Sequence, residues 1–244
     1  MPNPPGPAPK QDLTGAWIGP LNQSLVLGPF PAMTTAGEAR FRLNRPIIHV
    51  GDSEEHLVPT TDPFIGCDPL GFPRVARLPS QFGHGGLRFQ PMPNGMLIVY
   101  ELQRVWREIA MDGRQLPPKV DATGYPDSSY YGYSVGRWEG DNVFVVDTVG
   151  LDPRTWLDEF GRPHTSAAKV QERYTRTDQY NLELAVTVDD PKFYTQSFQL
   201  LKERFYWKKN QDLDEVLCIP SEAVGYQQKL ADPSGWGPEG KPVK

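Results

Sequence analysis

The sequence is poor in positive charge and lacks any long apolar run. Its 244 residues carry a formal net charge of -5. Nucleic-acid binding needs a basic face that neutralises phosphates, so we expect no nucleic-acid partner. No stretch approaches the roughly 20 apolar residues of a membrane helix, so we expect no membrane insertion either.

The common cofactor and metal signatures are also missing. The chain has no Walker loop, no dinucleotide fingerprint and no G-x-S-x-G nucleophile turn, which argues against redox and phosphoryl-transfer cofactors. Its histidines show none of the close spacings of a zinc site. We therefore expect neither a cofactor nor a metal. The four histidines are His49, His56, His84 and His164.

The N-terminal segment, MPNPPGPAPKQ, lacks the apolar core of a signal peptide. We therefore expect a cytoplasmic location, with the periplasm as the alternative if a leader has been removed. In the cytoplasm Cys67 and Cys218 remain buried thiols, which is the expected state. An oxidising compartment would instead allow them to form one long-range disulfide.

Proline is abundant, and most of the 26 prolines lie in the first half of the chain. Residues 1–11 are expected to form a flexible tail. Residues 28–82 alternate short apolar runs with proline and glycine, which predicts loops draped over a sheet and one short helix near Thr34–Phe41. The polar residues 229–244 predict a loop-like C-terminal tail, which leaves residues 12–228 as a single domain.

The second half consists of short runs of β-branched and aromatic residues separated by turn formers. Parallel strands need long crossovers, so turn-sized gaps predict antiparallel neighbours. Eight or more such strands usually close or curl to remove exposed edges. We expect an all-β fold: an antiparallel up-and-down barrel or strongly curved sheet, lipocalin-like, with Pro-rich loops covering it. The runs are DLTGAWIGPL, LRFQPM, GMLIVYELQ, RVWREIAM, YSVGRWEG, NVFVVDTVG, AKVQERYTRT, LELAVTVDD, SFQLLKERFYWKK and LDEVLCI.

Several of these runs place a charge on an apolar face, because alternate side chains of a strand share a face. A lone buried charge costs several kcal/mol, so each must be paired or line a polar pocket. One hypothesis is structural, with Arg107 and Arg137 each clamping a carboxylate across neighbouring strands. The other is that the charges line one cavity and orient a ligand. The charges are Arg107 beside Val105 and Ile109, Asp147 beside Val143 and Val145, and Glu172 beside Val170 and Tyr174.

The segment GYPDSSYYGYSVGRWEG brings tyrosines together with an arginine and a tryptophan. It contains Tyr131, Tyr133, Arg137 and Trp138. Tyrosine beside arginine suits an aromatic or carboxylate-bearing ligand, through stacking and charge-assisted hydrogen bonds. Tyrosines also decorate the rims of ordinary sheets, which is the structural alternative.

Two histidines lie in loops that suit a binding or catalytic role. His84, in the glycine-flanked FGHGGLRF, is a candidate general base because an imidazole titrates near neutrality. His164, in GRPHTS, is a candidate substrate contact. A solvated loop histidine is the alternative for both.

The chain also carries, in order, DLTGAW, CDPLGFPR, WREIAMDGR, SVGRWEGDNVFVVDT, WLDEFGRPHT, ERYTRTD, VDDPKFYT and EVLCIPSE. This series resembles a large family of bacterial hypothetical proteins, from Asp12 to about Gln228. The resemblance implies one domain of lipocalin-like β architecture with no settled general activity. It also implies that Cys67 and Cys218 are neighbours in space. Family members commonly carry a histidine where this chain has Tyr133, which implies a phenol in place of an imidazole.

We expect a cofactor-independent lyase that acts on a hydrophobic, aromatic and acidic small molecule in a barrel pocket. Decarboxylation or elimination needs only an acid, a base and a cationic anchor, and burial raises a carboxylate pKa toward the useful range. A non-catalytic lipocalin-like binding protein is the alternative, and an assembly protein, such as a homo-oligomer, is a third. The lyase roles are Arg107 or Arg137 as anchor, Tyr133 or Tyr131 as acid, Asp147, Glu172 or His84 as base, and Trp138 and His164 as substrate contacts.

Overall fold

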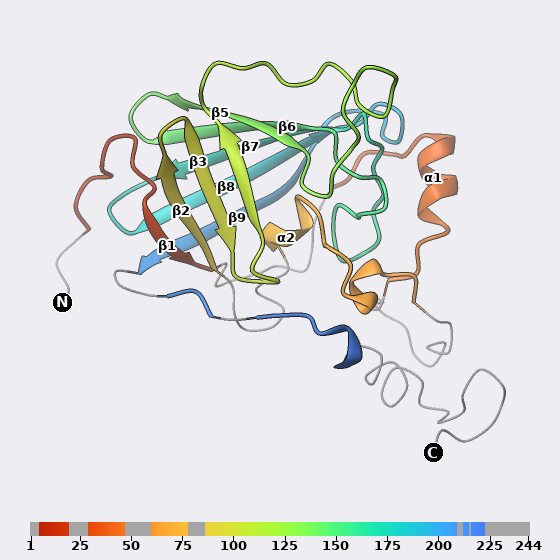
Figure 1. The fold of residues 1–244 in the computed structure, drawn as a ribbon, viewed down its shortest axis with the longest axis horizontal. Coiled ribbons are helices and arrows are strands. Elements are labelled where there is room, and N and C mark those ends of the chain that lie inside the picture. Colours follow the sequence, from red (N-terminus) through yellow and green to blue (C-terminus); the bar gives the residue numbers. More distant parts are fainter. Residues whose placement is uncertain are drawn as a thin grey trace.

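The computed structural model describes residues 5–19, 29–46, 60–77, 86–208, 212–214 and 216–222. Within these residues nine strands form one closed barrel in chain order, and β1 pairs with β9 to close it (Figure 1). The prediction of an all-β barrel is therefore confirmed. The strands are β1 (Gly15–Ile18), β2 (Gly86–Met92), β3 (Gly95–Tyr100), β4 (Trp106–Ala110), β5 (Tyr133–Glu139), β6 (Val143–Val149), β7 (Lys169–Arg176), β8 (Asn181–Asp189) and β9 (Phe198–Lys208).

Three short helical segments accompany the barrel: α1 (Thr35–Phe41), the 3-10 turn η1 (Pro63–Gly66) and α2 (Arg74–Arg77). The predicted helix near Thr34–Phe41 is confirmed by α1, which begins where the Thr34 hydroxyl accepts the Gly37 N–H at 3.1 Å. No helix in the described ranges has the length and apolarity to cross a membrane.

The last predicted strand run, LDEVLCI, is not a strand in the described part of the chain. It contributes only an isolated bridge between Val216 and Leu102. The pairing of β1 with β9 already closes the ring, so no sheet edge is left for a further strand. The predicted C-terminal tail, residues 229–244, lies outside the described residues, whereas Lys10 of the predicted N-terminal tail forms an ion pair with Asp141 at 2.9 Å.

The inner face of the barrel follows the predicted alternation on most strands. On β8 every second residue is buried, namely Leu182, Leu184, Val186 and Val188. On β4 and β7 the inward residues include Arg107 and Glu172, as their positions among apolar neighbours predict. Two charged side chains therefore lie inside the barrel.

Strand β6 is the exception, because both of its faces are apolar. Phe144, Val146 and Thr148 face inward, so Asp147 faces outward, and the hypothesis that it lines the interior is wrong. Its neighbour Val145 is nonetheless fully buried. Val145 lies in register between Arg137 on β5 and an arginine on β7, whose stems cover the outer surface.

A segment from the first half of the chain fills the interior instead of covering the outside. In α2 all four residues are buried, and just before it the Phe72 ring lies 3.8 Å from the Arg107 guanidinium carbon. The buried Arg74 holds the segment in place through two hydrogen bonds to Asp62, at 2.8 and 2.6 Å. We call residues 70–77 the plug. Its presence corrects the prediction that this stretch only drapes over the sheet, because its apolar side chains complete the core.

The plug lies close to a carboxylate on the buried face of β9. Arg77 donates to Glu159 at 2.7 Å, and its Nη1 lies 3.8 Å from Glu203. Burial raises the pKa of Glu203 to about 7, the neighbouring Glu159 adds to the rise, and Arg77 opposes it. Between pH 4.5 and 7 the folded protein therefore holds a proton that the unfolded chain releases, and stability falls as the pH rises through this window.

Substituting Glu203→Gln removes the buried charge and is expected to stabilise the protein by about 2 kcal/mol at pH 8. At pH 4.5 the wild-type side chain is already protonated in the folded state, so the variant should match the wild type. The measurement is urea unfolding at both pH values. Glu183→Gln, an outward carboxylate on β8 that pairs with Arg204 at 3.1 Å, is the control, with little change expected at either pH. Equal destabilisation of Glu203→Gln at both pH values would show that its ion pair with Arg77 dominates.

The barrel wall is weakest between β4 and β5. All other neighbouring strands are antiparallel, but these two share a single parallel pair, Ala110 with Val135. The cause is the connection of residues 111–132, which is far longer than a turn and lets β5 run parallel to β4. We call this junction the seam. Next to the shared pair, the absence of a side chain at Gly136 leaves room for Ile109. A Cβ at position 136 would lie only 2.7 Å from Cγ2 of Ile109.

Cys67 and Cys218 form a disulfide with a Cα–Cα distance of 5.4 Å. The expectation of buried thiols is therefore wrong, and the nearness implied by the family resemblance is confirmed. Cys67 ends η1, three residues before the plug, and Cys218 follows the bridge of Val216 to Leu102. The bond thus ties the start of the plug to the connection between β3 and β4.

Candidate functional site

The barrel interior contains a closed polar network around Arg107. Its guanidinium donates to both carboxylate oxygens of Glu172, at 2.8 and 3.0 Å. It also donates to the hydroxyls of Tyr100, Ser134 and Thr148, at 2.9 to 3.0 Å. Because β4 and β7 lie on different parts of the wall, the pair connects strands that are not adjacent.

Burial shapes the acid–base properties of this network. Burial would lower the pKa of Arg107, but the Glu172 carboxylate outweighs it, and the pKa lies above its usual range. Burial raises the pKa values of Tyr100 and Tyr174, and the Tyr174 hydroxyl donates to Glu172 at 2.7 Å. The network therefore holds its protons tightly. Arg107 therefore does clamp a carboxylate, but the hypothesis that it does so across neighbouring strands is wrong, because the pair spans β4 and β7.

A second clamp lies on the outer face of β5, β6 and β7. Arg137 forms an ion pair with Asp147 and another with Glu139 at 3.1 Å, while Gln171 donates to Asp147 at 2.8 Å. Arg137 and Asp147 are both partly exposed, with side-chain exposures of 48% and 32%. The clamp hypothesis holds for Arg137, and the wall separates this pair from Arg107 and Glu172.

The remaining predicted site residues are dispersed. Tyr131 packs against the core, and burial raises the pKa of its hydroxyl, which makes it a weaker acid than a solvated phenol. Trp138 packs on Phe144 with ring centroids 5.1 Å apart. His164 is buried, its Nε2 lies 2.8 Å from the Thr155 hydroxyl, and burial lowers its pKa.

The predicted residues thus do not meet in one cavity. His84 lies outside the described residues. Of the others, Tyr133 alone lines a cavity next to the seam, and Asp147 lines a different groove on the outer wall. Among the described residues, no three His, Cys, Asp or Glu side chains lie close enough together to hold a metal ion.

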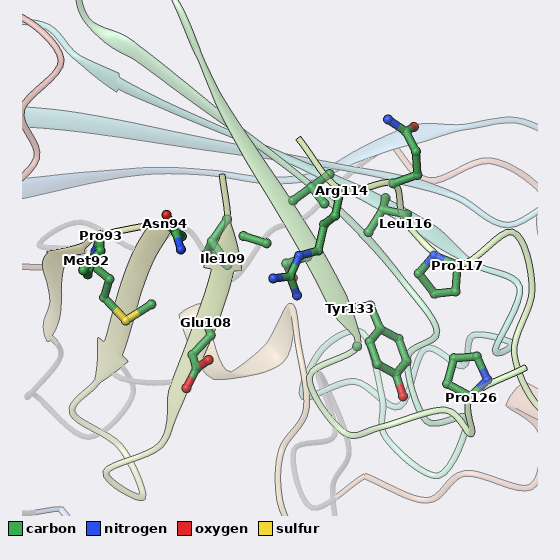
Figure 2. A pocket seen from close by; sticks show the side chains of 15 residues that line it. Met92, Pro93, Asn94, Glu108, Ile109, Arg114, Leu116, Pro117, Pro126 and Tyr133 are labelled. Carbon is green, nitrogen blue, oxygen red and sulfur yellow. The ribbon is translucent and has the colours of Figure 1, made fainter. Parts of the chain in front are cut away.

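A cavity of about 640 Å³ opens in the barrel wall at the seam (Figure 2). Its lining combines the facing parts of β4 and β5 with the turn between β2 and β3 and with the long connection between β4 and β5. We call it the seam cleft. It is lined by Met92, Pro93, Asn94, Glu108, Ile109, Ala110, Arg114, Gln115, Leu116, Pro117, Pro126, Gly132, Tyr133, Ser134 and Val135.

Three polar side chains surround the opening of the seam cleft. Arg114 points into the space between the strand that carries Glu108 and the side chain of Tyr133 (Figure 2). Its Nε and Nη2 donate to Asp112, and this contact lowers the pKa of Asp112 to about 2. Nη1 of Arg114 has no partner in the described ranges, so it is free to donate to a ligand. The Tyr133 hydroxyl donates to the carbonyl of Asp127 at 2.7 Å and can still accept.

The floor of the seam cleft connects it with the interior. Ser134 lines the cleft and accepts a hydrogen bond from the buried Arg107 at 3.0 Å. A ligand on this floor therefore lies one side chain away from the interior network. The sequence patterns did not point to Glu108 or Arg114, because these residues share a cleft with Tyr133 only where β4 and β5 separate.

No family model, curated protein or solved structure matches this chain.

Proposed function

We propose that this protein binds a small molecule with an apolar body and an acidic group in the seam cleft. The single observation that supports this most is the cleft itself. Its volume of about 640 Å³ lies within the range of about 300–1,000 Å³ that small-molecule sites occupy. The interior of the barrel is an unsuitable site, because the plug and the Arg107 network fill it.

The lining of the seam cleft defines the ligand. Met92, Leu116 and Val135 offer apolar surface, and prolines of the long connection extend it. Nη1 of Arg114 supplies a charge-assisted donor for a carboxylate or a similar anion. An amphipathic acid satisfies both features, since its body leaves water while its charge stays at the exposed rim.

Binding of aromatic and aliphatic carboxylates is expected to depend on two residues of the cleft. Ala110→Trp fills the space between the strands and should abolish binding, whereas Arg114→Gln should weaken carboxylates about tenfold or more and leave their neutral amides unchanged. The measurement is isothermal titration calorimetry with matched acids and amides.

The matched controls are Ala185→Trp and Arg204→Gln. Ala185 is a strand alanine away from the cleft, in register with Lys202, and Arg204 is an exposed arginine that also pairs with a carboxylate. Neither control should change the affinity. Undiminished binding in Ala110→Trp would place the ligand elsewhere and refute the proposal.

A cofactor-independent lyase is a second candidate function for the same cleft. The observation in its favour is that a phenol, a carboxylate and a guanidinium, those of Tyr133, Glu108 and Arg114, all line it. In an elimination Glu108 would accept the proton, Tyr133 would protonate the leaving group and Arg114 would hold the acid. Mass spectrometry of the incubated ligand separates the two candidates, because a binding protein returns the ligand unchanged.

The disulfide supports a periplasmic or other oxidising location for this function. Structural disulfides persist in oxidising compartments and are rare in the cytosol. The bond between Cys67 and Cys218 therefore favours the alternative location over the cytoplasm.

A further inference from the structure

A second groove, of about 1030 Å³, lies on the outer wall of the barrel. One side consists of residues of β6, β7 and β8 with the loops beside them, and the other is the stretch 116–120 of the connection between β4 and β5. In Figure 1 this connection crosses above β5 and β6 at the upper edge of the view. We call this site the outer groove. Leu116 and Pro117 separate it from the seam cleft, since they line both.

The outer groove contains more positive than negative unmatched charge. Lys119, Lys169 and Lys192 line it, and none of them forms an ion pair with another described residue. Of the two carboxylates in the lining, Asp147 is already matched by Arg137 and Gln171. The lining thus contains three lysines and one unmatched carboxylate, that of Asp189, in a chain whose net charge is -5.

Local contacts fix the backbone of Lys169 and Lys192 and place the Lys119 side chain against a ring. Lys169 begins β7, in register with Asp189. The carbonyl of Lys192 accepts the Thr34 hydroxyl at 2.6 Å, and its N–H donates to Asp190 at 3.3 Å. Lys119 follows two prolines, and its ammonium lies 4.6 Å from the centre of the Tyr125 ring. A site built in advance loses less entropy when it binds its ligand.

Neutral donors complete the lining. Thr187 and Ser197 line the groove, and their hydroxyls have no hydrogen-bond partner in the described part of the chain. Among the described residues that line the groove none is aromatic, so they offer no ring on which a sugar or base could stack. A lining of lysines and hydroxyl groups, without an aromatic ring for stacking, recognises the charge of a ligand rather than its shape.

We propose that the outer groove binds a small anion carrying several negative charges, a polycarboxylate or a phosphate ester. Three separated ammonium groups favour a multiply charged ligand over a singly charged one, because each contact adds its own Coulomb attraction. This site is distinct from the seam cleft and does not depend on the function proposed for it.

The test is isothermal titration calorimetry of the purified protein with citrate and with pyrophosphate, at constant ionic strength. The triple variant Lys119→Gln, Lys169→Gln, Lys192→Gln is expected to raise the Kd about 30-fold. Asp189→Asn should lower the Kd several-fold, because this substitution removes the unmatched carboxylate. Acetate should bind far more weakly than citrate.

The matched control is the triple variant Lys10→Gln, Lys202→Gln, Lys208→Gln, which removes the same charge from exposed lysines outside the groove. An unchanged Kd in this control supports the proposal. An equal loss in both triple variants, or no saturable binding of either anion by the wild type, overturns it. Preference for citrate identifies a polycarboxylate as the ligand class, and preference for pyrophosphate identifies a phosphate ester.

Discussion

Substituting Arg107→Met is expected to lower the free energy of unfolding by about 3–5 kcal/mol. The substitution leaves the fully buried Glu172 carboxylate without its main partner, and it also removes donors from Ser134 and Thr148. Equilibrium unfolding in urea at pH 7 measures the change. The double variant Arg107→Met, Glu172→Leu should recover part of the loss, because an apolar pair replaces two charges without leaving either unpaired.

The outer clamp is the natural control for the inner one. Arg137→Met breaks a pair of the same chemistry on the same barrel, but its side chains are partly exposed. Exposed pairs contribute about 0–1 kcal/mol, so the loss should not exceed about 1 kcal/mol. Equal losses for Arg107→Met and Arg137→Met would contradict the view that burial of the inner pair determines its effect.

Removing the disulfide with Cys67→Ala, Cys218→Ala is expected to destabilise the protein by about 2–5 kcal/mol. The bond joins residues 151 positions apart, so it restricts the unfolded chain over a long loop. For a protein of this size the melting temperature should fall by about 5–15 °C. Thermal unfolding with and without dithiothreitol gives the same comparison for the wild type.

The double cysteine variant supplies the control for the reductant, because dithiothreitol should leave its melting temperature unchanged. The bond also holds the start of the plug, so its loss should speed proteolysis within residues 68–77 more than within β7 and β8. If the reduced wild type melts at the same temperature as the oxidised protein, the disulfide does not support the plug.

Local sequence patterns predicted which side chains of a strand face the core, because this depends mainly on residues close in the sequence. The alternation in β8 placed Leu182 and Leu184 inward, and the apolar neighbours of Arg107 and Glu172 placed both charges in the core. The same rule failed for Asp147, because both faces of β6 carry buried valines, Val145 on the outer face and Val146 on the inner one. A period of two cannot show which of two apolar faces turns inward.

The candidate site depends on contacts between distant segments, and these left no local trace. Tyr133 was singled out from its tyrosine-rich segment, but Glu108 and Arg114 join it only because β5 meets β4 at a single pair. The plug was equally hidden, since its proline- and glycine-rich sequence resembles that of a surface loop. The disulfide was not predictable from local patterns either, because the sequence around Cys67 and Cys218 does not show the distance between the two sulfurs.

The pairing of β1 with β9 also determines when the protein can fold during synthesis. The ring cannot close until β9 has left the ribosome, and neither can the disulfide, whose second cysteine follows β9. Until then β1 and the plug have no complete core to join, and the strands between expose unpaired edges. A barrel closed by its first and last strands can therefore be completed only after β9 has been synthesised, and its unpaired edges are open to aggregation until then.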